Sequence, residues 1–469
     1  MTLRSQLAKF TRIAAKIAAG LLAFVLLLVL IWALINSFDT SISEQAKALL
    51  TPPPNPFRSS ENLYLAMAGL ESAGERSIIE LGQRRIEAYN QALDSTLRNP
   101  ELSLEFKKGW ESTKLPFSGK FEVGPQRTTS IWTDVKSHRQ DITTALVANQ
   151  LLYERYLSLH SLHGYYETAQ PSHLAPIVFV TPQLRILFLS DLAVRLQTGT
   201  LRERQEALSD IQLDLQMWKV VLQGDGTLLS KMLAAASLHA DFILLADLIT
   251  DPSTDPSSLG DALDSILLSL DPKDYRIGNA FAAEFRGTAA LYKSISFTNE
   301  YPISPAPSWW QRAWNTVQSH FFKSNATENM AAAHAAQWVA LGDSEPSQFY
   351  SSRERYREWL KNNGPHLTPA SLYNPIGKIL VALGGSQNDS YLLRVYDVAA
   401  YQRLVYLAFQ LRRQHIATPD IAAFLQAHPE WSTHPVDGKL FRWNPETAEL
   451  TVNTLGEDTR GRRFSVTLR

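Results

Sequence analysis

The sequence predicts a mainly α-helical protein: a single N-terminal transmembrane helix, an irregular multi-helix array of antiparallel helices, and a small C-terminal antiparallel β-meander. Three observations support this fold class. An unbroken apolar run lies near the start, apolar residues recur at helical spacing through most of the chain, and a two-residue alternation replaces that spacing near the end. Of the 469 residues, 45% are hydrophobic and 19% are charged, which is typical of a globular protein.

Charge and cysteine content exclude several classes of function. The chain has 45 Lys and Arg against 46 Asp and Glu, so no basic excess points to nucleic acid, and we expect no nucleic-acid partner. The absence of cysteine excludes disulfides, thiolate-bound zinc, iron–sulfur clusters and a cysteine nucleophile. The familiar hydrolase, zinc-protease and nucleotide-binding motifs do not occur, so we predict no catalytic, cofactor-binding or metal-binding residue and no cofactor.

The first element is an apolar helix. Residues 17–35 are 19 uncharged residues in a row, and as a helix they extend about 28 Å, close to the ~30 Å hydrocarbon core of a bilayer. We therefore expect a transmembrane helix over residues 17–36 that is the contact with the membrane. Basic residues precede the run, and two acidic residues follow it closely: Arg4, Lys9, Arg12 and Lys16, then Asp39 and Glu44.

This charge asymmetry predicts the topology. Positive residues stay on the cytoplasmic side, so residues 1–16 are expected in the cytoplasm and the body in the periplasm, as a single-pass protein of the bacterial inner membrane. A buried core helix is one alternative reading of the run, and a cleaved signal peptide is another. The run is longer than the ~7–15 apolar residues of a signal peptide, and residues 36–40 offer no small-x-small cleavage site, so an uncleaved anchor is favoured.

The next segments connect the anchor to the body. Residues 41–50 are compatible with a short helix, whereas 51–56 contain four prolines and favour an extended polyproline conformation. We interpret residues 37–58 as a proline-rich spacer and residues 59–435 as a helical periplasmic domain. Within it, the periodicity predicts helices over 63–70, 76–97 and, as one long element, 134–163.

The clearest helical signals lie between residues 181 and 250. Thr181-Pro182 begins a helix that ends before Gly199, and further helices are expected over 201–222 and 227–249, separated by Gly224-Asp225-Gly226. Short connections predict antiparallel packing. Later helices are expected over 259–270, 275–294, 309–322, 327–341, 348–362, 370–382, 390–415 and 421–426, with a proline-rich loop over 301–307.

The last 34 residues, 436–469, have a different pattern. Apolar residues alternate in three short stretches: Phe441 with Trp443, Leu450 with Val452, and Phe464 with Val466 and Leu468. This alternation predicts a three-stranded antiparallel meander. Because so small a sheet is unstable alone, it is expected to pack on the helices.

Several short motifs resemble a family of uncharacterised proteobacterial envelope proteins. They are Glu61-Asn62-Leu63-Tyr64 with Gly69-Leu70, Trp218 with Lys231-Met232 and Leu244-Leu245-Ala246-Asp247-Leu248, Asn325-Ala326-Thr327-Glu328-Asn329, Asn374-Pro375-Ile376-Gly377-Lys378, Arg394-Val395-Tyr396-Asp397, and Pro435-Val436-Asp437-Gly438-Lys439 with Trp443. The resemblance implies an N-terminal membrane anchor and a helical periplasmic body. It implies no activity.

Two groups of side chains have the spacing of a metal site or of a surface contact. His160, His163 and Glu167 have the spacing of ligands on one helix face, but Gly164 interrupts them, and a solvated or hydrogen-bonded histidine pair is the simpler interpretation. Asp134 and His138 are four residues apart and are expected to form a surface contact.

Two polar residues fall within apolar helix stripes. His239 lies in the stripe of the helix over 227–249, and Asp397 lies in that of the helix over 390–415. A buried carboxylate is costly unless it is paired, so we predict a basic or amide partner for Asp397, with Lys231 and Arg394 as the first candidates. A structural bridge between helices is the favoured role, and a catalytic or ligand-binding carboxylate is the alternative.

These observations favour a membrane-anchored periplasmic scaffold or binding protein of the cell envelope, with an envelope protein or peptidoglycan as partner. A groove formed by Trp309, Trp310 and Trp314 is one candidate surface for glycan or peptide. The alternative function is an envelope hydrolase that acts on glycan or peptide through carboxylate and histidine residues. A hydrolase requires these groups to converge in an open cleft, whereas a scaffold leaves them sealed and paired and exposes an apolar patch.

Overall fold

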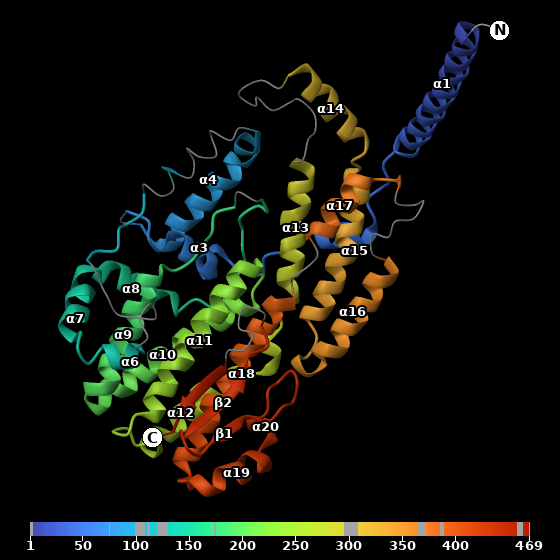
Figure 1. Ribbon diagram of the computed structural model, residues 1–469. Coiled ribbons are helices and arrows are strands. Elements are labelled where there is room, and N and C mark those ends of the chain that lie inside the picture. The colour runs from blue at the N-terminus through green and yellow to red at the C-terminus, as the bar shows by residue number, and fades with distance from the viewer. Residues whose placement is uncertain are drawn as a thin grey trace. The chain divides into compact units, whose positions relative to one another are not determined.

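The computed structural model describes residues 3–74, 76–98, 108–109, 113–119, 130–172, 175–294, 308–363, 372–384, 389–456 and 463–468 (Figure 1). It divides the chain into two compact units. The first comprises Met1–Thr51, Ala289–His334 and Trp359–Ser386, and the second comprises Pro52–Thr288, Ala335–Glu358 and Gln387–Arg469. Residues 59–435, which the sequence suggested as one helical domain, thus contribute to both units.

The first unit includes the apolar N-terminal helix, which contacts the other helices of the unit through its last turn. It contains α1 (Leu3–Ile35), α2 (Glu44–Leu50), α14 (Trp309–His320) and α17 (Pro375–Gly384), with parts of α13 (Gly278–Ser294), α15 (Ser324–Gly342) and α16 (Phe349–Asn363). The predicted helix over 370–382 begins only at Pro375, and residues 364–371 and the predicted loop over 301–307 lie outside the described residues.

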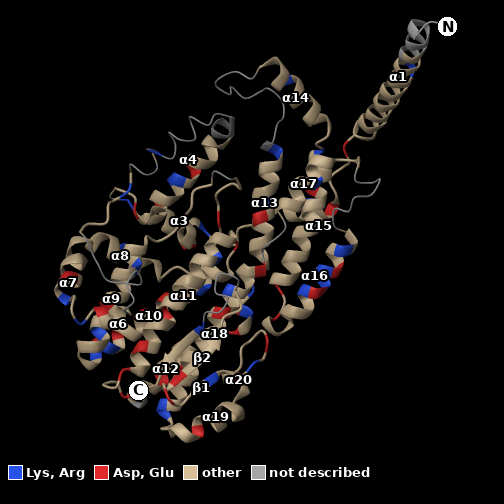
Figure 2. Cartoon of the chain, viewed as in Figure 1, with Lys and Arg blue, Asp and Glu red and all other residues tan. Residues whose placement is uncertain are grey.

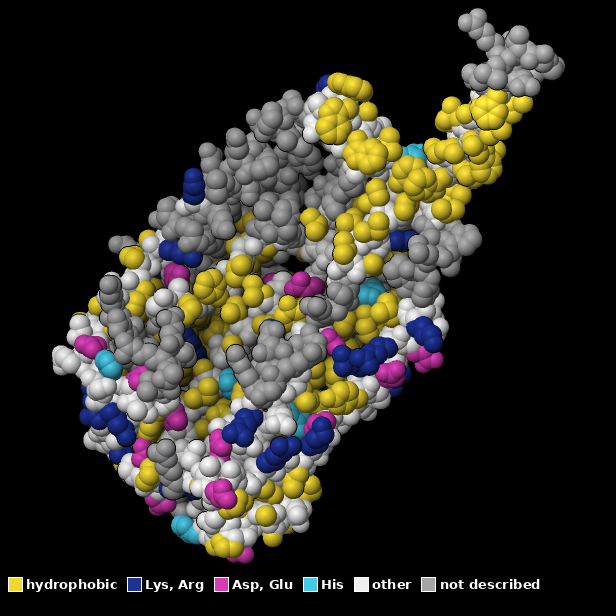
Figure 3. Space-filling model, in the orientation of Figure 1, with side chains coloured by type: hydrophobic (Ala, Val, Ile, Leu, Met, Phe, Trp, Pro, Cys, Tyr) yellow, Lys and Arg dark blue, Asp and Glu magenta, His cyan; other side chains and the backbone are white. Residues whose placement is uncertain are grey.

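Among the described residues, two helices are long and apolar enough to cross a membrane by length and composition. In α1 the stretch Ile13–Ile35 has a mean hydropathy of 2.9 and none of it is buried, so its apolar side chains cover its surface (Figure 3). The other helix, α11 (Leu228–Thr250), is more than half buried in the second unit. Because α11 also carries Lys231 and Asp241, both fully buried, it is a core helix of that unit.

The helices of the first unit meet where α1 ends. The buried Asn36 side chain donates to Leu372 O (2.8 Å) and accepts from Asn374 N (2.7 Å). The Asp39 carboxylate then accepts from the backbone amides of Asn325 and Ala326 at the first turn of α15. An acidic group at this position satisfies free amides and complements the helix dipole.

The second unit begins with a close helix pair, α3 (Leu63–Gly69) and α4 (Ile78–Arg98). A Cβ on Gly69 or Gly82 would lie 1.8 Å from a carbonyl oxygen of the other helix, so glycine is needed at both positions for this approach. Asn62 caps α3 and also holds the segment around Tyr166, with which it exchanges two hydrogen bonds.

The predicted long helix over 134–163 is wrong. The structure has three helices there: α6 (Ile131–Asp134), α7 (Arg139–Ala148) and α8 (Gln150–Leu159). The chain leaves helical geometry at His138 and at Asn149, both with φ −117° and ψ 21°. Asn149 is buried, and its side chain exchanges hydrogen bonds with the backbone of Ser118, which stabilises the break.

Four helices form the centre of the second unit: α9 (Pro182–Thr198), α10 (Leu201–Gln223), α11 and α18 (Asp389–Arg413). The helix α11 packs against both α10 and α18. Their predicted bounds are confirmed to within two residues. Shorter helices complete the unit: α12 (Gly260–Leu267), α19 (Ile421–Ala427) and α20 (Pro429–Ser432), with 3₁₀ turns at Ser59–Glu61, Pro256–Leu259, Pro272–Tyr275, Pro346–Gln348 and Thr418–Asp420.

The C-terminal meander is confirmed. Strands β1 (Arg442–Asn444), β2 (Glu449–Asn453) and β3 (Arg463–Thr467) form an antiparallel sheet in the order β1-β2-β3. Trp443 pairs with Leu450, and Val452 pairs with Phe464. Both β2 and β3 pack on α18, as expected for a sheet too small to be stable alone (Figure 1).

Charged residues are distributed unevenly among these helices. In Figure 2 both acidic and basic positions are coloured along α16, whose sequence carries two acidic and four basic residues. In contrast, α14 has no acidic residue, and α17 contains a single charged residue, Lys378. These two helices of the first unit therefore have little charge to keep them soluble.

Candidate functional site

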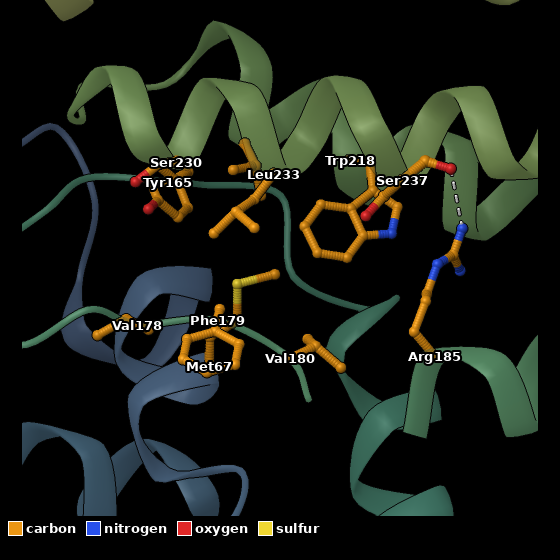
Figure 4. A pocket seen from close by; sticks show the side chains of 11 residues that line it. Met67, Tyr165, Val178, Phe179, Val180, Arg185, Trp218, Ser230, Leu233 and Ser237 are labelled. Atoms are coloured by element: carbon orange, nitrogen blue, oxygen red, sulfur yellow. Dashed lines mark hydrogen bonds between the residues drawn. The ribbon is translucent and has the colours of Figure 1, made fainter. Parts of the chain in front are cut away.

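The second unit contains a mainly apolar slot between α11 and the elements that face it (Figure 4). Leu233, Ser230 and Ser237 line it from α11, while Met67 on α3 and the extended segment 178–180 line the opposite side. Tyr165, Trp218, Val221 and Arg185 complete the lining. The cavity volume of the slot is about 40 Å³. Its lining is mainly apolar with a few polar atoms, as in ligand-binding pockets, but its volume is well below the roughly 300–1,000 Å³ of pockets that enclose a small molecule.

Trp218 gives the slot an unused hydrogen-bond donor. Trp218 is buried, with only 3% of the residue exposed. The indole nitrogen lies toward the Arg185 end of the slot (Figure 4) and has no hydrogen-bond partner within the described residues. Buried indole N–H groups usually find an acceptor. A ligand acceptor could fill that role.

A buried charge cluster adjoins this end of the slot. The Arg185 guanidinium donates to the carboxylates of Asp214 and Asp241, and also to Tyr156 Oη at 2.9 Å. Asp214 Oδ1 in turn accepts from Tyr156 Oη and lies 3.1 Å from His160 Nε2. All five side chains are at most 8% exposed. Because they come from α8 and its end, α9, α10 and α11, the cluster ties four elements together.

Charge compensation explains why this cluster is tolerated in the core. Burial alone would raise the pKa of Asp214, but the Arg185 charge and hydrogen bonds from His160 and Tyr156 outweigh it and lower the value to about 2. For Asp241, burial raises the pKa well above its usual range, and the neighbouring Asp214 charge adds to the effect. Burial would lower the pKa of Arg185, yet the two aspartates raise it. The favoured state is therefore one carboxylate, one carboxylic acid and one guanidinium, with no net charge.

Sequence reasoning missed this cluster. The signal was present, because Arg185, Asp214 and Asp241 each lie among apolar positions of their helices. Periodicity alone does not reveal that three such positions on three helices face one another.

A second polar group surrounds the start of α11. Glu167 Oε1 accepts from Thr227 N (3.1 Å), Tyr165 Oη (3.0 Å) and the Ser230 hydroxyl. Glu284 accepts from Leu228 N at 2.8 Å, so two carboxylates cap this helix N-terminus. These contacts fix the slot wall that carries Tyr165 and Ser230.

Lys231 is fully buried one turn further along α11. Its ammonium nitrogen donates to the carbonyls of Val221 (2.8 Å) and Gly224 at the end of α10. Burial lowers the pKa of Lys231 to about 7, and the charges of Glu167 and Asp225 offset only part of that effect. Lys231 thus binds the free carbonyls of a helix end and is not the partner of Asp397.

The predicted metal spacing does not produce a metal site. Helix α8 ends at Leu159, so His160 turns into the Asp214 cluster, while Glu167 caps α11 and His163 lies in the intervening loop. The described part of the chain contains no group of three or more His, Asp or Glu side chains arranged to hold a metal ion. The hydrogen-bonded interpretation of His160 is supported.

Asp397 is buried and has a basic partner, His434, as predicted, but the first candidates for that partner, Lys231 and Arg394, are wrong. Its carboxylate accepts from the backbone amides of Leu455 (2.8 Å) and Gly456 (3.0 Å), and His434 Nε2 lies 3.4 Å away. The Arg394 guanidinium instead lies over the Tyr391 ring. Asp397 therefore joins α18 to the chain segment between β2 and β3, because main-chain amides supply the donors that a buried carboxylate needs.

His239 lies in the same region. Its ring packs against Tyr401 on α18 and Phe464 on β3, with centroid distances of 4.8 and 4.6 Å. Its Nε2 is buried without a hydrogen-bond partner in the part of the chain that the structure describes. Burial lowers the pKa of His239 to about 4 despite the nearby Asp397 charge. The ring is neutral at physiological pH and packs as an aromatic residue.

Asp134 and His138 do not form the expected surface contact, because Asp134 is buried. His138 Nδ1 lies 2.9 Å from the backbone carbonyl of Asp134, so the two residues meet through the main chain and not through the carboxylate. Trp309, Trp310 and Trp314 are 77%, 57% and 57% exposed on α14. They form an open helix face and not a groove.

Comparison with known proteins identified no matching family model, curated protein or solved structure.

Proposed function

We propose that this chain is a membrane-anchored scaffold or binding protein of the bacterial cell envelope. In this proposal α1 crosses the inner membrane once, the N-terminus is cytoplasmic and the body is periplasmic. One observation carries it: the end of α1 is part of the folded first unit. Asn36 is fully buried and bonded to Leu372 and Asn374, and Asp39 caps α15. Cleavage near residues 36–40 would remove contacts that the fold uses, so a retained anchor is favoured over a leader.

The body supports binding more than hydrolysis. The carboxylates and histidines that a hydrolase would use, Asp214, Asp397 and His160, are buried and already hydrogen-bonded. The slot, in contrast, offers apolar walls and the unpartnered Trp218 N–H. We propose that it receives an apolar group that carries a hydrogen-bond acceptor, from an envelope protein or a peptidoglycan-derived ligand.

Photo-crosslinking from the edge of the slot tests this function. A benzoylphenylalanine at the exposed Ile177, in the full-length chain in its native membrane, should give a discrete adduct. Leu233→Trp fills the slot and should abolish the adduct. Leu229→Trp introduces the same residue on the exposed surface of the same helix and should leave the adduct unchanged. An adduct equally strong in both tryptophan variants would contradict binding in the slot.

A further inference from the structure

The amphipathic helix α14 is the most exposed apolar feature of the first unit apart from α1. At about 100° per residue, five apolar side chains span an arc of about 140° on this helix. We name them the α14 face: Trp309, Trp310, Ala313, Trp314 and Val317. No residue of α14 is buried, so nothing in the described structure covers this face.

The position of α14 along the chain suggests what covers it. At its C-terminal end, His320 Nε2 lies 2.8 Å from Ala33 O, and the Phe321 ring packs on Trp32 at a centroid distance of 4.2 Å. Both contacts are with the last turn of α1. If α1 spans a bilayer as proposed above, this end of α14 lies at the bilayer surface.

The length of α14 limits how far the helix can extend from that surface. Trp314 is six residues from His320 and Trp309 is eleven, which correspond to about 9 and 17 Å along a helix. In Figure 3 apolar side chains cover both α14 and α1 in the same part of the view. Tryptophan is the residue most typical of the boundary between lipid chains and headgroups, because its ring is apolar and its N–H is polar.

The charges of α14 and α17 are compatible with a position at the bilayer surface. The only charged side chain of α14 is Arg312, and the only one of α17 is Lys378, so neither helix carries an acidic residue that would repel phospholipid headgroups. The exposed Ile379 and Leu383 of α17 belong to the same unit, and α17 starts directly after Asn374, which binds Asn36 at the end of α1.

From this geometry we infer that α14 is a second membrane contact: it lies in the lipid–water interface with the α14 face toward the acyl chains. This inference rests on the proposed anchoring by α1. It adds that the first unit contacts the bilayer at two places, α1 and α14, so that its orientation relative to the membrane does not depend on α1 alone. The occupant of the α14 face is phospholipid and not a second copy of the chain, a glycan or a peptide.

The absence of cysteine allows a direct test with single labels. Val317→Cys lies on the α14 face, and Asn315→Cys lies on the opposite side of the same helix. Each full-length variant is labelled with an environment-sensitive fluorophore and reconstituted into vesicles of phosphatidylethanolamine and phosphatidylglycerol. We expect lipids with a nitroxide near the headgroup to quench the Val317→Cys label about twofold or more, and to leave the Asn315→Cys label nearly unchanged.

A third label separates this inference from the proposed anchor. Leu27→Cys lies midway along the apolar stretch of α1 and should be quenched by a nitroxide deep in the acyl chains. If Leu27→Cys is quenched and Val317→Cys is not, the interfacial role of α14 is wrong and the anchor stands. If Leu27→Cys is not quenched, the anchor itself is wrong. A Val317→Cys label shielded from aqueous iodide but not quenched by lipid would mean that protein covers this face, which also overturns the inference.

Discussion

At the scale of single residues, buried charged side chains are the main polar feature of this protein, and the largest group has specific partners. Arg185 is the centre of that group because it donates to both Asp214 and Asp241. The sequence identified Asp397 and His239 as polar residues within apolar stripes, and the structure confirms the burial of Asp397. Their partners could not be predicted, because backbone amides 58 and 59 residues away supply them for Asp397.

Replacement of Arg185 should be severely destabilising. In Arg185→Met the buried Asp214 carboxylate loses its counter-charge and Asp241 loses its guanidinium donor, and we expect a loss of about 3–5 kcal/mol in the free energy of unfolding. Urea unfolding in detergent, followed by tryptophan fluorescence, measures it. The control is Arg202→Met, which removes an exposed ion pair with Glu206 and should change little. Equal stability of the two variants would show that the cluster does not hold the helices together.

His239 should make stability depend on pH. Its folded-state pKa of about 4 is below its unfolded value of about 6.5, so the unfolded state binds more protons between these values. The contribution of the neutral ring is complete above pH 6.5 and is lost as the pH falls to 4, by about 3 kcal/mol in total. His239→Phe keeps an aromatic ring against Tyr401 and Phe464 but does not titrate. Unfolding of both proteins at pH 7 and pH 4.5 should therefore show a smaller pH effect in the variant, and the same pH effect in both would contradict this assignment.

At the scale of elements, local sequence patterns predicted helices and strands correctly where a single signal, such as a helix-start motif or an alternation of apolar residues, dominated. Thr181-Pro182 begins α9 and the alternating residues form the meander, as expected. The long helix over 134–163 failed because Asn149, which is compatible with a helix by propensity, instead bonds the distant backbone of Ser118. The packing of the meander on the helices was expected, but neither the choice of α18 nor the link through Asp397 was, because both depend on tertiary contacts.

The Asp397 link can be tested through two substitutions. Asp397→Ala leaves the amides of Leu455 and Gly456 without their acceptor, and we expect a loss of about 2–4 kcal/mol, with faster proteolysis of the tail from residue 436 onward. Asp397→Asn retains one acceptor oxygen and should lose less. Limited proteolysis with mass spectrometry measures the tail directly. An Asp397→Ala protein as resistant as the wild type would mean that the meander is held by apolar packing alone.

At the scale of the whole molecule, the account depends on α1. The sequence predicted its length and apolar character, and the structure adds what no local pattern shows: the end of α1 binds residues about 290 to 340 positions later, through Asn36, Trp32 and Asp39. These contacts make the anchor part of the first unit. The slot and the charge cluster belong to the second unit, so the proposed anchor and the proposed binding site lie in different units of the chain.

Alkaline carbonate extraction of membranes from cells that express the full-length chain tests the central claim most directly. Carbonate removes proteins that only adhere to a bilayer, whereas a helix that crosses the hydrocarbon core remains. We predict that the intact polypeptide stays in the membrane pellet. Recovery of a soluble polypeptide that begins after about residue 40 would contradict the claim, because that is the product expected from a cleaved leader.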